Sequence, residues 1–135
     1  MITIPKPLRY ALFLIKVTLV LHILALLFWL ISYAQSTYWP FVIVTGFYSI
    51  CMTLPYYLFF LIYLKRGSKM TRGLFVVANL VIFIGLLHLA TEEHPAATSS
   101  INSSTILNYL FALLQLYACF LLYRPSSHAY FNRSS

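Results

Sequence analysis

Few residues of this 135-residue chain can do chemistry, and several of them stand together in the stretch LLHLATEEHPA at residues 86–96. His88 and Glu92 are four residues apart there, so their side chains can touch on a helix. His22 lies at a similar depth along an earlier apolar run. Imidazole and carboxylate groups bind zinc, and histidines facing each other across a bundle can bind haem iron. The candidate metal ligands are therefore His22, His88, Glu92 and His94.

Three interpretations of this cluster stay open. A metal site needs three or four converging ligands, and the spacing of these residues matches no tight metal-binding motif. A histidine can also serve as a proton-transfer or pH-sensitive group. The simplest interpretation, which we favour, is that these polar residues end a helix at the interface between membrane and water. We accordingly expect no cofactor, with a bound metal or haem as the alternative.

The composition indicates which medium surrounds these residues. Hydrophobic residues make up 61% of the chain and charged residues only 8%, whereas soluble proteins are about one quarter charged. About 20 apolar residues cross a bilayer as a helix, and backbone amides in lipid must be paired within the segment. We therefore expect an all-α polytopic membrane protein. Its four transmembrane helices are predicted at residues 8–31, 41–64, 74–90 and 106–123.

The basic residues predict the orientation. They lie before the first run or at its start, between the second and third runs, and after the fourth, while residues 32–40 and 91–105 contain none. Basic residues gather on the cytoplasmic side of a membrane. The sequence thus predicts a single domain, a four-helix up-down bundle in the cell inner (plasma) membrane with both termini cytoplasmic. The first helix is expected to remain uncleaved, and residues 124–135 to form a short cytoplasmic tail.

Polar side chains within the predicted spans are functional candidates, because they are costly in hydrocarbon. They are Lys16, His22, Asn79, His88, Asn108 and Gln115. The amides can simply bridge neighbouring helices. Lys16 can extend its amine toward the headgroups, or it can contact an anion or a partner inside the membrane. Asn108 and Gln115 share one face of their helix, whereas Asn79 and His88 point to opposite faces of theirs.

A second set of residues is expected to anchor the bundle at the inner interface. Pro125 should stop the fourth helix, and Tyr130 and Phe131 should lie back into the interface as an amphipathic anchor. The basic anchors that would contact lipid phosphates are Lys65, Arg66, Lys69, Arg72 and Arg124.

Three segments carry a resemblance to a known group. They are the start PLRYALFLIKVTLVLH (7–22), the middle loop KRGSKMTR (65–72) and the tail LLYRPSSHAYF (121–131). Over nearly its whole length the chain resembles a widespread group of small bacterial four-helix inner-membrane proteins of unknown function. Members show Arg-Gly, an aromatic residue and Arg in the middle loop, and Pro-Ser with an aromatic pair in the tail. Here Met70 stands in place of the loop aromatic. The resemblance implies the fold and no activity.

No catalytic motif is present in the sequence: there is no serine elbow, phosphate loop or paired-cysteine motif. We therefore expect a protein that is not an enzyme. The leading prediction is an accessory or interaction subunit, or an immunity-type component. Its partners would be the lipid bilayer and either another membrane protein or further copies of itself, and no nucleic acid.

Two other functions stay open. One is a small oligomeric transporter or channel, with Lys16, His22, Asn79 and Gln115 along its path. The other is a metal- or haem-binding membrane redox protein built on the histidines.

Overall fold

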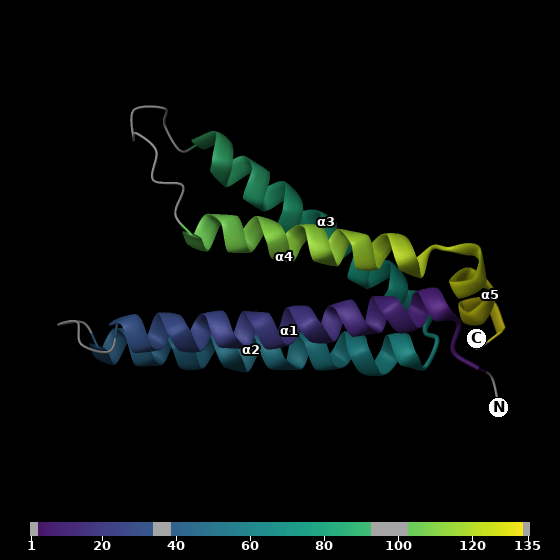
Figure 1. Cartoon of the computed structure of the whole chain (residues 1–135), viewed down its shortest axis with the longest axis horizontal. Helices are drawn as coiled ribbons and strands as arrows, with labels where there is room; N and C mark the ends of the chain where they lie inside the picture. Colours follow the sequence, from purple (N-terminus) through teal and green to yellow (C-terminus); the bar gives the residue numbers. More distant parts are fainter. Residues whose placement is uncertain (1–2, 34–38, 93–102, 134–135) are drawn as a thin grey trace.

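A computed structural model describes residues 3–33, 39–92 and 103–133, and these residues form helices only. Four long helices are followed by a short one (Figure 1). They are α1 (Lys6–Tyr33), α2 (Trp39–Lys65), α3 (Lys69–Glu92), α4 (Ser103–Leu122) and α5 (Pro125–Arg133). The all-α prediction is confirmed for this part of the chain. The first three helices begin two to five residues before the predicted apolar runs, because their first turns include residues that precede those runs.

Three of the helices are long and apolar enough to cross a membrane by themselves, over Lys6–Ser32, Trp39–Lys65 and Lys69–His88. A fourth span is obtained within the described residues when Ile106–Leu122 is taken together with α5, although the chain bends by 67° between them. A 27-residue helix is about 40 Å long, which exceeds the roughly 30 Å hydrocarbon core of a bilayer. The architecture is thus compatible with a multi-pass membrane protein.

Successive long helices run in opposite directions, and the start of α1 and the whole of α5 lie at the same end of the bundle (Figure 1). We call this the basic end, and the opposite end the far end. Every described lysine and arginine except Lys16 belongs to the first or last turns of a helix, or to a turn, at the basic end.

The helices form two arms, which pack together through α1 and α4 from the basic end to the middle of the bundle, where His22 stacks on Phe111. One arm is the antiparallel pair α1 and α2, and the other is α3 and α4 (Figure 1). The best-packed core lies where the arms join: Leu8, Ile15, Leu64 and Phe75 are fully buried, and the Phe60 and Phe75 ring centroids are 5.0 Å apart. α1 contacts both α2 and α4 extensively, whereas α2 and α3 contact each other little.

The turn between α2 and α3 explains how the basic end is built. Gly67 has φ 80°, a left-handed conformation that glycine adopts without strain. Its N–H donates to the Leu64 carbonyl at 3.0 Å, and the Ser68 N–H donates to the Tyr63 carbonyl at 3.2 Å, so α2 ends in a glycine cap. Ser68 then caps α3, because its Oγ accepts the Thr71 N–H at 3.3 Å. This turn fixes the position of the residue that follows it, Arg72.

The tail differs from the prediction that its aromatic pair would lie in the membrane interface. Residues after the fourth span form α5, which begins at Pro125, a favourable first helical residue. Ser127 and Phe131, four residues apart, are fully buried against the bundle. Tyr130 is only partly buried. Phe131 is therefore part of the protein core, since a nine-residue amphipathic helix buries its apolar face on the helices it caps.

The α1–α2 arm is held at its far end by a close helix contact, which gives a first testable prediction. A Cβ atom added at Gly46 would overlap the Leu30 side chain, whereas one added at Gly85 on α3 would meet nothing within 4 Å. We expect Gly46→Val to lower the free energy of unfolding by about 1–3 kcal/mol through overpacking. The matched variant Gly85→Val should change it by less than about 0.5 kcal/mol. Unfolding of purified protein in mixed detergent micelles measures both, and equal effects would contradict the packing described here.

Candidate functional site

The most elaborate side-chain arrangement lies at the basic end, around Arg72. Its guanidinium carbon is 4.5 Å from the centre of the Tyr123 ring and 4.9 Å from that of the Phe131 ring. Its Nη1 donates to Nδ1 of His128 at 3.1 Å. Only 7% of Arg72 is exposed. We call these four residues the arginine clasp.

Two hydrogen bonds from α5 to neighbouring helices fix the clasp. Ser127 Oγ donates to the Leu121 carbonyl at 3.0 Å, across the bend between α4 and α5. The Tyr130 hydroxyl donates to the Lys65 carbonyl at 2.8 Å, at the end of α2. The basic end thus joins α2, α3, α4 and α5 into one unit.

The physical role of the clasp follows from its charge. A guanidinium group is always charged and is stabilised by the negative faces of aromatic rings. Tyr123 lies in the turn between α4 and α5 and Phe131 lies in α5, so the attraction holds this part of the chain against α3. Arg72 Nε has no hydrogen-bond partner, and the side chain is buried. The clasp therefore stabilises the fold of the basic end.

The other predicted interface anchors are placed differently from Arg72. Lys65, Arg66, Lys69 and Arg124 are all exposed, as contact with lipid phosphates requires. The Arg66 and Arg124 guanidinium carbons lie 5.6 Å from the Tyr63 ring centre and 5.2 Å from the Phe120 ring centre. Arg72 is the one predicted anchor among these that is enclosed by protein.

Two of the predicted intramembrane polar residues are buried. Asn79 Nδ2 donates to the Phe75 carbonyl at 2.8 Å, one turn back on its own helix, so this bond does not bridge two helices. Neither amide atom of Gln115 has a hydrogen-bond partner, and the buried Tyr56 hydroxyl has none either. Thr18 is fully buried and donates to the Leu14 carbonyl at 2.8 Å.

The remaining polar candidates do not join this interior set. His22 is half-buried and stacks on the Phe111 ring at 5.6 Å between centroids. His88 and Asn108 are exposed on α3 and α4, and Lys16 is exposed on α1. The four groups of the proposed transport path therefore differ in burial: two amides are buried, one histidine is half-buried and one lysine is exposed.

The metal candidates lie only partly within the described residues. His94 and the side chain of Glu92 are outside them. Among the residues that the structure describes, no three His, Cys, Asp or Glu side chains come close enough to hold a metal ion. His22 instead contacts aromatic rings, with Tyr57 at 6.3 Å in an edge arrangement.

The sequence did not single out His128, which belongs to the clasp, or Ser127, which holds α5 in place beside it. The signal that could have found them is the spacing after Pro125: Ser127 and Phe131 are one helical turn apart, with basic and polar residues on the other faces. Pairing of α5 with Arg72, 56 residues away from His128, is a tertiary contact that local spacing does not encode.

No protein-family model, no curated protein and no solved structure matches this chain. The arrangement of its side chains is therefore the basis for any functional argument.

The clasp gives a second prediction, tested by cysteine labelling. In a background with Cys51→Ala and Cys119→Ala, a Ser127→Cys thiol should react slowly with maleimide because Ser127 is fully buried. Adding Arg72→Met should raise that rate about tenfold, since two cation–π contacts together contribute at least about 1.4 kcal/mol.

The matched control is Lys69→Met, which removes one exposed positive charge from the same helix. It should leave the labelling rate of the Ser127→Cys thiol unchanged. Equal acceleration by the two variants would show that net charge, rather than the clasp, holds α5 in place.

Proposed function

We propose that this protein is a non-enzymatic interaction subunit of the cell inner membrane, which binds a transmembrane helix of a partner through the far half of α3. The observation that supports this is the packing of α3 along its length. Its buried residues are Thr71, Arg72, Phe75 and Asn79, all in the half nearer the basic end. From residue 80 to residue 88 no side chain is buried.

A continuous exposed stripe begins at Val77 and runs through the far half of α3. Val77, Val81, Ile84, Gly85 and His88 recur at helical spacing on one face, and the three aliphatic residues are 58–63% exposed. Gly85 leaves its backbone open, since nothing lies within 4 Å of the position of a Cβ. Small residues allow transmembrane helices to approach closely, and association in lipid depends on such packing.

In this half of the helix, α3 is hydrogen-bonded to α4: the Tyr109 hydroxyl donates to the Leu86 carbonyl at 3.2 Å. This bond lies on the side of α3 that faces α4. It holds α3 in place while leaving the exposed stripe available to a partner helix.

The proposed topology has four membrane spans, the fourth made by α4, with α5 and both termini in the cytoplasm. The basic end supports this orientation, because lysine and arginine accumulate on the cytoplasmic side. The exposed stripe of α3 is consistent with an accessory subunit and with an immunity-type component, because both would bind another membrane protein.

Site-specific photocrosslinking in native membranes tests the proposal. A photoreactive phenylalanine analogue at Val81 should form a discrete product with one protein. The same analogue at Val44, an exposed valine of α2, should not. Gly85→Val should reduce the Val81 product at least fivefold, because the added side chain keeps the partner helix away.

The mass of the product identifies the partner. A product at twice 15.6 kDa means a second copy of this chain, and any other mass means a different subunit. Products of equal yield at Val81 and Val44, or a Val81 product unaffected by Gly85→Val, would contradict an α3 interface.

A further inference from the structure

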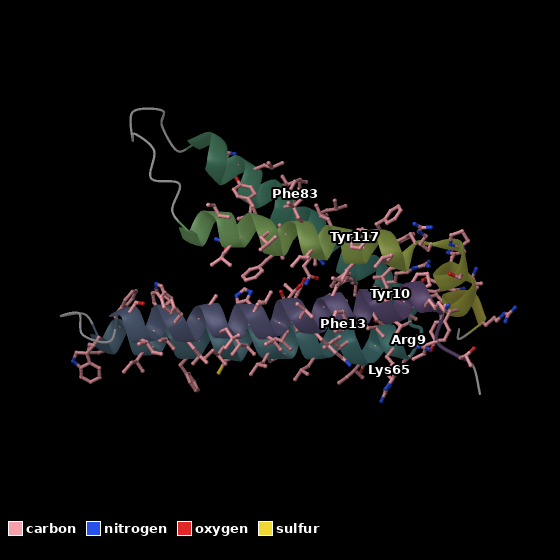
Figure 2. All side chains as sticks on the ribbon, in the orientation of Figure 1. Arg9, Tyr10, Phe13, Lys65, Phe83 and Tyr117 are labelled. Carbon is pink, nitrogen blue, oxygen red and sulfur yellow. The ribbon has the colours of Figure 1, made fainter. Side chains whose placement is uncertain are left out.

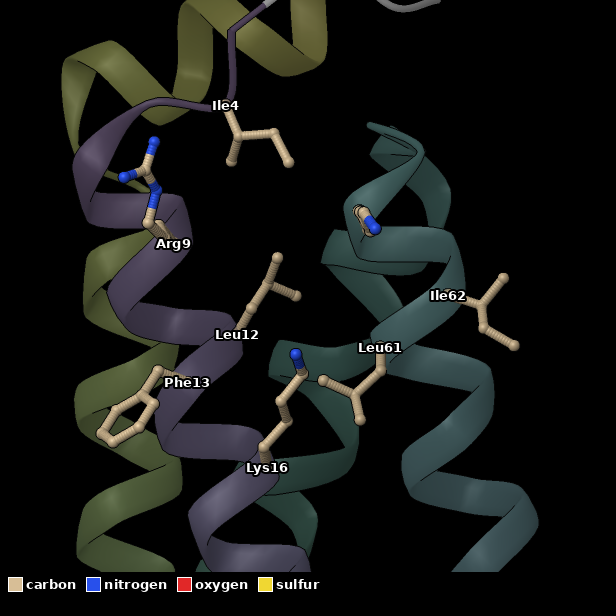
Figure 3. A pocket seen from close by; sticks show the side chains of 8 residues that line it. Ile4, Arg9, Leu12, Phe13, Lys16, Leu61 and Ile62 are labelled. Carbon is tan, nitrogen blue, oxygen red and sulfur yellow. The ribbon is translucent and has the colours of Figure 1, made fainter.

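A groove lies on the surface of the α1–α2 arm at its basic end, with a volume of about 440 Å³ (Figure 3). Its walls are the first three turns of α1 and the last two turns of α2. Three basic residues line it, Arg9, Lys16 and Lys65, together with apolar residues that include Leu12 and Leu61. The volume falls within the range of about 300–1,000 Å³ that is usual for small-molecule sites.

Among the residues that the structure describes, no Asp or Glu side chain lies at this end beside the three cations of the groove. The chain contains only two acidic residues, Glu92 and Glu93, and Glu92 is the last residue of α3, at the far end. Arg9, Lys16 and Lys65 are all exposed. The groove therefore carries three positive charges, and no described acidic side chain neutralises them.

Lys16 is the basic residue of the groove that lies farthest from the basic end. It follows Arg9 by seven residues, so its Cα lies about 10 Å farther along α1 from the basic end. Its side chain extends back along the groove toward Ile4 and Arg9, beside Leu12 and Leu61 (Figure 3). An ammonium group at such a depth in hydrocarbon is costly unless an anion reaches it.

We propose that this groove binds one anionic phospholipid of the leaflet at the basic end. The phosphate oxygens would accept hydrogen bonds from the Arg9 guanidinium and from the ammonium groups of Lys16 and Lys65. Arginine and lysine are the residues that bind phosphate in this way. An acyl chain would follow the apolar wall that Leu12, Phe13 and Leu61 provide.

The apolar lining favours a lipid over a free phosphate ion. Five of the eight lining residues are aliphatic or aromatic: on α1, Leu12 and Phe13 lie between Arg9 and Lys16, and on α2, Leu61 and Ile62 lie farther from the basic end than Lys65. Phe13 is 61% exposed at the edge of the groove, on a helix surface that would face lipid. Basic pockets between transmembrane helices on the cytoplasmic side are typical sites for anionic headgroups. This inference is independent of the proposed α3 interface, and it rests only on the α1–α2 arm lying in a bilayer.

Native mass spectrometry of the full chain, stripped of lipid in detergent, tests the site. Added phosphatidylglycerol should give one saturable bound lipid, and phosphatidylcholine should bind much more weakly. Arg9→Gln with Lys65→Gln should weaken phosphatidylglycerol binding about 25-fold, because each basic residue near an anionic lipid contributes about a fivefold factor. Lys16→Met should weaken it about fivefold.

The matched control is Lys6→Gln with Arg133→Gln, which removes two exposed positive charges at the same end from residues that neither line the groove nor belong to the predicted anchors. This variant should keep the affinity of the unaltered protein. Equal weakening by the two double variants, or equal binding of the two lipids, would overturn the proposal. Competition by inorganic phosphate at the same concentration as the lipid would show that the groove takes the free ion, and would also overturn it.

Discussion

Backbone hydrogen bonding in an apolar medium is the constraint on which the rest of this structure depends. A segment that enters hydrocarbon must pair its own amides, so it becomes a helix over its full apolar length. The same medium excludes charge, and eight of the nine lysine and arginine residues lie in terminal turns, interhelical turns or α5. Lys16 is the exception, and its side chain extends back toward the basic end.

The basic end is consequently where the chain builds tertiary structure. Its glycine cap, the arginine clasp and the buried Phe131 join four helices within a few turns. Toward the far end the two arms diverge, and the side chains of α3 become exposed (Figure 2). In lipid an exposed apolar face has little cost, because acyl chains solvate it as well as leucine does. The exposed face of α3 can thus lie in lipid without loss of the fold, which is what the proposed interface requires.

The helices could be predicted because apolar length and the distribution of basic residues are local properties of the sequence. The site around Arg72 could be predicted only in part. Arg72 was expected at an interface, but its burial depends on α5, which folds back from a position more than 50 residues later. The position of Lys16 could also be predicted only in part. Its distance from the basic end follows from the number of residues along α1, whereas its proximity to Lys65 depends on the packing of α1 on α2.

The most direct test of a membrane-spanning bundle with one basic face is the accessibility of single cysteines in intact cells. In a background without Cys51 and Cys119, Arg133→Cys and Lys69→Cys should be shielded from a membrane-impermeant maleimide and should react after permeabilisation. Ser99→Cys should react without permeabilisation. Labelling of Ser99→Cys and Arg133→Cys from the same side of the membrane would contradict the topology from which the α3 interface and the lipid groove are oriented.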